Sequence, residues 1–342
     1  MKIWLDILTP KQILFFEPII QRLKKNHTVL CTSRKYNQVT ELAKIRKQKL
    51  VIIGKHGGAE KYDKLSASLS RSKLLVKKIS KFSPDITLSF CSPEAARISY
   101  GLGIKHICFS DSPHAENVMR LVVPLVQKLL IPWIIPKEKF TKFGINRNNI
   151  IQYKAIDAAI ISKRKIKNIK KTGGKRKLIL IRLEEDEASY SLKKRPIIPI
   201  VKEILKEFSG QEILIMTRYT SQKKYLQQIF QKKIKVLSTV IDSKLLLYNT
   251  DIFIGSGGTM TAESALLGIP TISYDAVPNI IEDYLVKKKL VIREVNPKKM
   301  VSVMKKVFKS SNSRRKNRAK KIMSSMEDPY PVFLKTMKSV MK

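Results

Sequence analysis

The stretch Asp251-Ile-Phe-Ile-Gly-Ser-Gly-Gly-Thr-Met-Thr-Ala-Glu-Ser-Ala-Leu-Leu-Gly-Ile-Pro270 decides the fold. Its pattern predicts a buried strand over Ile252–Ile254, a glycine-rich turn over Gly255–Gly258 and a short helix over Thr259–Leu267. A glycine and a proline then end the helix, and a second apolar strand follows. A strand, a helix and a further strand in this order are typical of an α/β fold with a parallel sheet.

The glycine-rich turn also predicts an anion site. Gly257 and Gly258 leave the backbone bare at the start of the helix, where unpaired N–H groups and the helix dipole attract negative charge. Ser256 and Thr259 flank these glycines, and Glu263 lies one turn inside the helix, at a position suited to accept hydrogen bonds from a sugar hydroxyl. A phosphate next to a diol indicates a nucleotide-sugar. The alternative is an ordinary structural turn, in which Glu263 only complements the helix dipole.

The net charge is the most extreme property of the composition. Of the 342 residues 43% are apolar, which is enough for the cores of two domains. The 68 Lys and Arg outnumber the 27 Asp and Glu and give a formal net charge of +41. Such a charge attracts nucleic acid, an anionic membrane surface or phosphorylated substrates. A lysine bias throughout the proteome is the alternative explanation.

Cysteine usage and the N-terminus predict a cytoplasmic protein. Cys31, Cys91 and Cys108 have no metal-binding spacing and fall in or beside predicted strands, which indicates buried thiols in a reducing compartment. The N-terminal sequence has the pattern of a strand interrupted by Asp6 rather than that of a signal peptide, and no stretch has the pattern of a transmembrane helix. A peripheral position on the inner face of the membrane is a further hypothesis, with Val118–Pro136 as an apolar segment beside the basic surface.

Short apolar strands alternate with amphipathic helices along the chain, which predicts two tandem Rossmann-like domains with parallel sheets facing a cleft. The predicted parts are an N-terminal, acceptor-side domain (1–161), a basic linker (162–177), a C-terminal, nucleotide-sugar-side domain (178–328) and a C-terminal helix (329–342) that packs back on the N-terminal domain. The linker is predicted from its nine Lys or Arg and its lack of acidic residues. Within the N-terminal domain the pattern predicts a helix over Glu116–Leu130 and a strand over Trp133–Ile135.

Functional loops in such sheets follow the carboxyl ends of the strands. One loop of the N-terminal domain holds Lys55, His56, Gly57 and Gly58. Lys55 and the bare glycine amides suit an anion, and the imidazole of His56 suits proton transfer. A flexible loop without function is the alternative.

A second loop of the same domain holds Asp111 and His114. Their separation allows a catalytic base with an orienting carboxylate. An Asx turn that caps the next helix explains the same residues equally well, so both interpretations stand.

In the C-terminal domain, Arg182 and Arg218 lie at the ends of two predicted strands, where a contact with phosphate is expected. No Asp-x-Asp sequence occurs, which argues against a diphosphate held through a divalent metal. We therefore expect no metal and no cofactor, with the nucleotide-sugar as a substrate.

The sequence from Ser256 to Glu263, with Gly268-Ile-Pro270 after it, resembles the nucleotide-sugar loop and helix of glycosyltransferase-B (GT-B) enzymes. Glu263 follows Ser256 by seven residues, as in the transferase that adds N-acetylglucosamine to the peptidoglycan lipid intermediate. The resemblance implies a ribose contact for Glu263. The UDP-N-acetylglucosamine 2-epimerases have a related loop that is one residue shorter.

Over nearly its whole length the chain resembles an archaeal family of unknown function with a GT-B-like fold. The matching pieces are Lys2-Ile-Trp-Leu-Asp6, Phe15-Phe-Glu-Pro18, Ile53-Gly-Lys-His-Gly-Gly58, Ser92-Pro-Glu-Ala95, Asp111-Ser-Pro-His-Ala115 and Gly257-Gly-Thr-Met260. The chain departs from these patterns in two places. Its first loop reads Pro10-Lys-Gln12 where the family has a histidine-containing turn, and it lacks the glycine-rich first loop of the peptidoglycan enzyme.

Three hypotheses for the function result. The first is a metal-independent glycosyltransferase that uses a nucleotide-sugar, with His114 or His56 as the base and a membrane lipid-linked or glycan acceptor. The second is an enzyme similar to the UDP-sugar 2-epimerases. The third is a protein without enzymatic activity that binds polyanions such as nucleic acid. Because no recognition-helix motif or aromatic-rich strand accompanies the charge, we expect no specific nucleic-acid partner.

Overall fold

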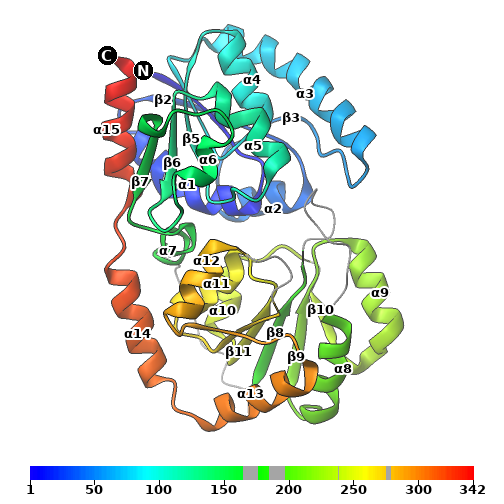
Figure 1. Cartoon of the computed structure of the whole chain (residues 1–342). Coiled ribbons are helices and arrows are strands. Elements are labelled where there is room, and N and C mark those ends of the chain that lie inside the picture. The colour runs from blue at the N-terminus through cyan, green and yellow to red at the C-terminus, as the bar shows by residue number, and fades with distance from the viewer. Residues whose placement is uncertain (165–175, 185–196, 238, 275–278) are drawn as a thin grey trace. The chain divides into compact units, whose positions relative to one another are not determined.

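The computed structural model describes residues 1–164, 176–184, 197–237, 239–274 and 279–342. These residues form two compact units (Figure 1). Unit 1 comprises residues 1–160 and 327–342, and unit 2 comprises the described residues between 161 and 326.

Unit 1 contains a parallel sheet with seven strands among the described residues, in the order β3-β2-β1-β4-β5-β6-β7. Its strands are β1 (Lys2–Asp6), β2 (Thr28–Lys35), β3 (Val51–Lys55), β4 (Ile86–Ser89), β5 (Lys105–Phe109), β6 (Lys128–Pro132) and β7 (Ile150–Tyr153). Its helices are α1 (Pro10–Leu23), α2 (Asn37–Ile45), α3 (Lys61–Phe82), α4 (Pro93–Gly101), α5 (Glu116–Val122), α6 (Glu138–Thr141) and α15 (Pro329–Met341). The short helix α7 (Asp157–Ser162) lies at the boundary of the two units.

Unit 2 contains a second parallel sheet, with six strands among its described residues in the order β10-β9-β8-β11-β12-β13. Its strands are β8 (Leu178–Arg182), β9 (Glu212–Met216), β10 (Lys235–Leu237), β11 (Ile252–Gly255), β12 (Thr271–Ser273) and β13 (Val291–Arg293). Its helices are α8 (Ile197–Glu207), α9 (Thr220–Phe230), α10 (Ser243–Tyr248), α11 (Thr259–Leu266), α12 (Ile280–Lys287), α13 (Pro297–Lys309) and α14 (Ser313–Ser324). The predicted pair of Rossmann-like parallel-sheet domains is therefore confirmed.

The core of unit 1 is built around aromatic rings. Phe15 of α1 packs edge-to-face on Phe90 and Phe109, with ring centroids 5.3 and 5.1 Å apart. Phe333 of α15 lies 6.2 Å from Phe109, and both side chains are buried. Buried aromatic pairs in such geometries stabilise a core beyond the area that they remove from water. The C-terminal helix thus contributes to the hydrophobic core of unit 1.

The region after Glu116 differs from the prediction. The helix ends at Val122, residues 128–132 form β6, and Trp133–Ile135 lies in the turn that follows. Pro124 lacks the N–H that a continued helix needs, and a short apolar run fits a buried strand as well as a helix. Most apolar side chains of Val118–Pro136 are buried, whereas Leu121 is 58% exposed. None of the described helices has the length and apolar character that a membrane span requires.

The start of the predicted linker is ordered within unit 2, whereas residues 165–175 lie outside the described residues. The buried guanidinium of Arg164 pairs with Asp242 at 3.1 Å. The ammonium of Lys244 donates to the carbonyl oxygen of Ser162 at 2.7 Å. The chain therefore packs against unit 2 from its first residues after α7.

Candidate functional site

The strand order places the topological switch point of unit 2 between β8 and β11. In open α/β sheets, ligands bind beyond the carboxyl ends of the strands at this point. Arg182 ends β8 and Ser256 follows β11, so these two residues flank the switch point. Arg218 follows the neighbouring strand β9. The structure thus brings Arg182, Arg218 and Ser256, which were predicted from separate loops, to one edge of one sheet.

Tyr274 connects these residues, although the sequence pattern did not point to it. Its buried hydroxyl donates to a carboxylate oxygen of Glu184 at 2.7 Å and lies 3.1 Å from the carbonyl oxygen of Arg182. Burial, and then the charge of Glu184, raise the pKa of Tyr274 well above its usual range, whereas a hydrogen bond with Ser256 and the charge of Arg218 act in the opposite direction. Tyr274 is therefore a protonated hydrogen-bond donor that connects the ends of β8, β11 and β12.

The turn after β11 requires a glycine at position 257. Gly257 has φ +94°, and a Cβ at this position would overlap with the carboxylate of Glu282. The side-chain amide of Asn279 donates to the carbonyl oxygen of Gly257 at 3.0 Å, and the N–H of Gly257 donates to the hydroxyl of Thr261 at 3.2 Å. Packing within unit 2 therefore explains Gly257 without any ligand.

Gly258 differs from Gly257 in a way that matters for ligand binding. It has an ordinary backbone conformation (φ −81°), is exposed, and has no atom of the described residues within 4 Å of the position that a Cβ would take. Gly258 is also the N-cap of α11, and among the described residues no side chain caps this helix. Open space and uncapped N–H groups at a helix N-terminus are features that favour an anion. Thr259 begins the helix at the same place.

Glu263 lies inside α11 and is 3% exposed. The hydroxyl of Ser243, at the start of α10, donates to its carboxylate at 2.7 Å. Burial raises the pKa of Glu263 to about 7, against the effects of the Ser243 hydrogen bond and the charge of Arg164. The carboxyl group therefore keeps its proton to a higher pH than an exposed glutamate does.

In unit 1, Asp111 forms an ion pair that was not predicted. The ammonium of Lys11, in the first turn of α1, lies 2.8 Å from Asp111 and 3.0 Å from Asp157. Burial acts to raise the pKa of Asp111, but Lys11 and the surrounding hydrogen bonds hold it at about 2. His114 is exposed, and desolvation lowers its pKa while the charge of Asp111 opposes that effect. The structure thus brings Asp111 and His114 into electrostatic reach, with Asp111 held by Lys11.

Asp157 is the second acid of this cluster, and the sequence pattern did not reveal it. Burial, and then the charge of Asp111, raise its pKa to about 7, although Lys11 acts to lower it. The hydroxyl of Tyr153 donates to Asp157 at 3.0 Å. Two carboxyl groups whose environments separate their pKa values around one ammonium are able to hold and release a proton near neutral pH. A lysine at the start of the first helix, in Pro10-Lys-Gln12, was the available signal.

Packing and backbone conformation explain the two glycines of the loop after β3. A Cβ on Gly57 would come within 2.5 Å of the backbone oxygen of Asp63, and Gly58 has φ +71°. The imidazole of His56 stacks on the ring of Tyr36 at 4.8 Å, and its Nδ1 accepts the N–H of Gly58 at 3.0 Å. Lys55, at the end of β3, is exposed. The structure brings Lys55, His56 and the two glycines together in one turn.

A buried ion pair lies at the switch point of unit 1, between β1 and β4. The guanidinium of Arg71, from α3, reaches Asp6 with nitrogen–oxygen distances of 2.6 and 3.1 Å, and both side chains are fully buried. The hydroxyl of Ser92 also donates to Asp6 at 2.6 Å. Burial acts to raise the pKa of Asp6, but Arg71 and the hydroxyl groups keep it below its usual value. An aspartate inside an apolar strand was the sequence signal for this pair.

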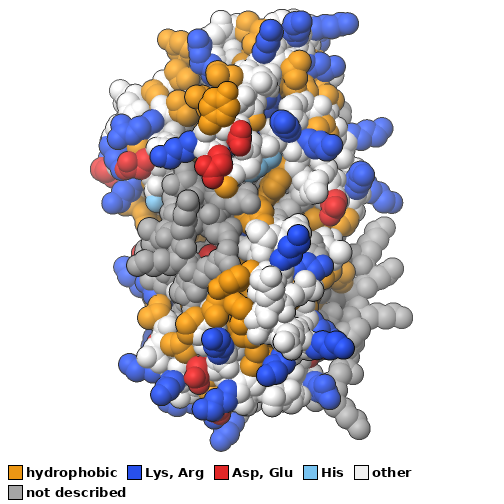
Figure 2. All heavy atoms as spheres, turned by 90° about the vertical axis from the view of Figure 1, so that its right-hand side faces the viewer, with side chains coloured by type: hydrophobic (Ala, Val, Ile, Leu, Met, Phe, Trp, Pro, Cys, Tyr) orange, Lys and Arg blue, Asp and Glu red, His pale blue; other side chains and the backbone are white. Residues whose placement is uncertain are grey.

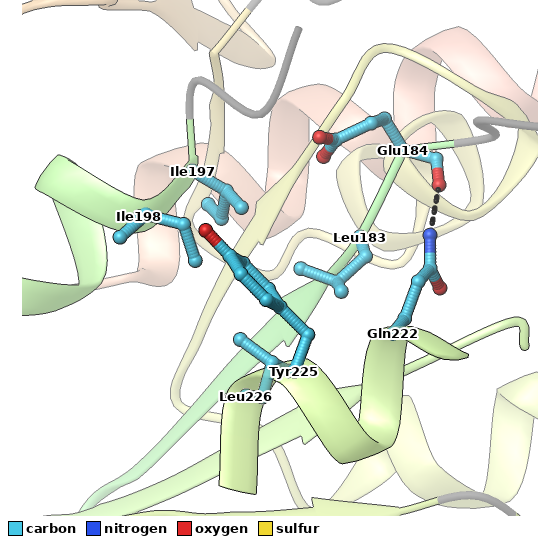
Figure 3. A pocket seen from close by; sticks show the side chains of 7 residues that line it. All are labelled: Leu183, Glu184, Ile197, Ile198, Gln222, Tyr225 and Leu226. Atoms are coloured by element: carbon cyan, nitrogen blue, oxygen red, sulfur yellow. Dashed lines mark hydrogen bonds between the residues drawn. The ribbon is translucent and has the colours of Figure 1, made fainter. Parts of the chain in front are cut away.

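A shallow pocket lies at the carboxyl edge of β8 (Figure 3). It is lined by Leu183, Glu184, Ile197, Ile198, Gln222, Tyr225 and Leu226. The amide of Gln222 donates to the carbonyl oxygen of Glu184 at 3.2 Å, whereas the carboxylate of Glu184 points away from Gln222. Glu184 therefore borders both this pocket and Tyr274. Within the described residues, no three His, Cys, Asp or Glu side chains are grouped so as to hold a metal ion.

Comparison with families and curated proteins gives two matches. A family model described as "Protein of unknown function (DUF354)" matches residues 1–342. The protein "Uncharacterized protein MJ0665" from Methanocaldococcus jannaschii is 29% identical over 316 residues, which covers 88% of this chain and 89% of that protein.

Similar solved structures include two epimerases and a transferase. The UDP-GlcNAc 2-epimerase from Neisseria meningitidis, bound to UDP-GlcNAc, aligns with a TM-score of 0.75 and 16% identity over 99% of this chain and 100% of that chain. The UDP-GlcNAc 2-epimerase from Methanocaldococcus jannaschii, in complex with UDP-GlcNAc and UDP, aligns with a TM-score of 0.70 and 16% identity over 92% and 94%. The spinosyn rhamnosyltransferase SpnG, complexed with thymidine diphosphate, aligns with a TM-score of 0.61 and 13% identity over 98% and 99%. At these identities the likeness shows the fold, and it confirms the predicted GT-B-like class.

Proposed function

The chain belongs to the family described as "Protein of unknown function (DUF354)", and we propose that it is a glycosyltransferase that uses a nucleotide-sugar donor. One observation carries the proposal. The open, uncapped start of α11 at Gly258 lies at the switch point of unit 2, beside the strand ends that carry Arg182 and Arg218. This arrangement offers backbone N–H groups and two guanidinium groups to one diphosphate.

The chemistry of sugar transfer fits these residues. The acceptor oxygen forms a bond to C1 of the sugar, while the bond from C1 to the diphosphate oxygen breaks and its electron pair leaves with the diphosphate. Negative charge therefore grows on the leaving group, and Arg182, Arg218 and the N–H groups of α11 stabilise that charge. Glu263 accepts hydrogen bonds from the ribose in this proposal. No metal enters the proposed reaction.

The proton of the acceptor hydroxyl goes to a base, which we assign to unit 1. His114 is the first candidate, because its lowered pKa leaves the imidazole neutral and able to accept a proton at pH 7. Asp157, whose pKa is about 7, is suited to accept a proton from a neighbouring group of unit 1. His56 is the alternative base. The proposed acceptor is a hydroxyl group of a glycan or of a lipid-linked sugar.

The sharpest test uses the empty space beside Gly258. The substitution Gly258→Ala places a methyl group where no described atom lies within 4 Å, so the free protein tolerates it. A bound diphosphate needs that space, and we expect the dissociation constant for the nucleotide-sugar to rise at least tenfold. Calorimetry with UDP-, GDP- and dTDP-sugars measures this change. Gly210→Ala is the matched control, because Gly210 also has an open Cβ position but lies before β9, at the opposite edge of the sheet.

Two results would contradict the proposal. The first is the absence of binding of any of these nucleotide-sugars to the wild-type protein. The second is equal affinity for the wild type, Gly258→Ala and Glu263→Ala, which would place the ligand elsewhere.

A 2-epimerase is the second candidate, since the epimerase structures align with higher TM-scores than the rhamnosyltransferase does. Inversion at C2 removes and returns the proton on that carbon. This candidate therefore predicts that deuterium from D₂O enters the sugar of UDP-GlcNAc when no acceptor is present, as mass spectrometry detects. Transfer of the sugar to an added acceptor without deuterium uptake would instead support the transferase.

A further inference from the structure

Two of the three cysteines touch each other inside unit 1. The Sγ atoms of Cys91 and Cys108 are 3.6 Å apart, although the residues are 17 positions apart in the sequence. Cys108 lies in β5 and is fully buried, whereas Cys91 follows β4 and is 9% exposed. Both are free thiols, as is the third cysteine, Cys31 of β2. The fold therefore creates a pair of adjacent thiols that the sequence spacing did not indicate.

The turn after β4 directs Cys91 toward Cys108. Ser89 of β4 is the sheet partner of Cys108, and Cys91 lies two residues beyond it, just before α4. Cys91 has φ +52°, in the left-handed region that residues with a side chain rarely adopt. Such a conformation costs free energy and is often found at functional sites. In this conformation the N–H of Cys91 donates to the Sγ of Cys108 at 3.1 Å.

The surroundings of Cys108 favour its thiolate form. Its Sγ accepts the N–H of Cys91 and, at 3.8 Å, the hydroxyl of Ser89. Burial acts to raise the pKa of Cys108, but the hydrogen bonds from Cys91 and Ser89 hold it below its ordinary value. Cys31 differs, because burial raises its pKa to about 11. The thiolate is the nucleophilic form of cysteine, so Cys108 is suited to attack a sulfur atom that lies beside it.

We propose that Cys91 and Cys108 form a redox-sensitive site, at which hydrogen peroxide converts the two thiols into a disulfide. The sulfur of Cys91, which is the more exposed, attacks one oxygen of the peroxide. The O–O bond breaks, and the departing hydroxide takes up the thiol proton and becomes water. The sulfur of Cys108 then attacks the sulfur of the resulting sulfenic acid, so that the S–S bond forms and the S–O bond breaks. The second hydroxide leaves with the proton of Cys108, and two thiols and one peroxide have given one disulfide and two waters.

Distance and access both fit this reaction. The sulfur atoms must approach from 3.6 Å to about 2.05 Å, a change that side-chain rotation and a small shift of the turn supply. Side chains cover unit 1 closely on the side of α3 (Figure 2). A small oxidant such as peroxide therefore suits this site better than the disulfide of another protein. In a reducing compartment such a bond is transient and serves redox sensing. The proposal does not depend on the proposed enzymatic activity.

Counting of free thiols in the full-length protein tests the proposal. The native protein is treated with a small molar excess of hydrogen peroxide, catalase removes the excess, and the chain is unfolded and titrated with DTNB. The count should fall from three to one, and dithiothreitol should restore three. Digestion with trypsin, without reduction, should release a peptide in which residues 82–97 are joined to residues 106–120. Mass spectrometry identifies this peptide, which contains Cys91 and Cys108.

Two variants complete the experiment. Cys31→Ser is the matched control, because Cys31 is also buried, and its count should fall from two to zero. Cys91→Ser should keep both of its remaining thiols under the same treatment. The proposal would be overturned by three remaining thiols in the wild type, by a linked peptide that contains Cys31, or by oxidation of Cys91 without a linked peptide. If Cys91→Ser fails to fold, the peptide map of the wild type decides by itself.

Discussion

The hydroxyl of Ser243 lies 2.7 Å from the carboxylate of Glu263, inside unit 2. This bond joins the start of α10 to the middle of α11, the helix that begins at the open Gly258. The proposed ribose contact and the packing of the two helices therefore involve the same carboxyl group. Burial raises the pKa of this carboxyl group to about 7. The pH dependence of protein stability therefore tests its packing role separately from the proposed ribose contact.

The first prediction concerns the stability of Glu263→Gln as a function of pH. Between pH 4.5 and 7 the folded wild type keeps a proton on Glu263 that the unfolded chain releases, so its free energy of unfolding falls as pH rises through this window. The amide of Gln carries no such cost. The variant should gain stability relative to wild type from pH 5 to pH 8, by up to about 3 kcal/mol, as urea unfolding measures. A gain that is equal at both pH values, or that the exposed Glu207→Gln shares, would contradict the raised pKa.

The second prediction compares two neighbouring glycines. Gly257→Ala forces a side chain to φ +94° and against Glu282, and it should lower the free energy of unfolding by at least about 2 kcal/mol. Gly258→Ala should change it by less than about 0.5 kcal/mol. Thermal and urea unfolding of the two variants measure the difference. Equal destabilisation would show that the open space at Gly258 is not present in solution.

The third prediction concerns the buried ion pair of unit 1. Arg71→Met leaves the carboxylate of Asp6 buried without its partner, and the free energy of unfolding should fall by about 3–5 kcal/mol. The exposed pair of Lys235 and Glu212 is the control, because Glu212→Gln should cost less than about 1 kcal/mol. If both variants unfold at the same urea concentration as the wild type, the pair does not carry the stability assigned to it.

The fourth prediction concerns metal removal. If Arg182, Arg218 and the N-terminus of α11 offset the diphosphate charge, the dissociation constant for the nucleotide-sugar should stay within twofold after dialysis against EDTA. Calorimetry before and after dialysis, and again after addition of Mg²⁺, measures this. Loss of affinity that Mg²⁺ restores would show that a metal shares the task.

The periodicity of the apolar residues predicted both parallel sheets, because strands covered on both faces and amphipathic helices leave different patterns. It was wrong around β6, where Leu129, Leu130 and Ile131 are all fully buried. An apolar run of this length fits a buried strand as well as a helix. Pro124 interrupts a helix, but the strand is identified only by its pairing with β5 and β7.

Part of the candidate site was accessible from the sequence. Arg182, Arg218 and Ser256 could be predicted because each ends or follows a strand, and the carboxyl ends of parallel strands meet at one edge of the sheet. Lys11, Asp111 and Asp157 come from three separate parts of the chain, and no local pattern indicates that they meet. The raised pKa of Asp157 arises from burial and from Asp111, and both depend on the tertiary structure.

Unit 1 is completed by residues that are synthesised after unit 2. Phe333 packs on Phe109, and the chain passes through all of unit 2 between these two positions. Until α15 has been synthesised, the aromatic core of unit 1 lacks the packing of Phe333 on Phe109. The nascent chain therefore exposes that core to chaperones and to aggregation during the whole synthesis of unit 2, and the core closes only after α15 has been synthesised.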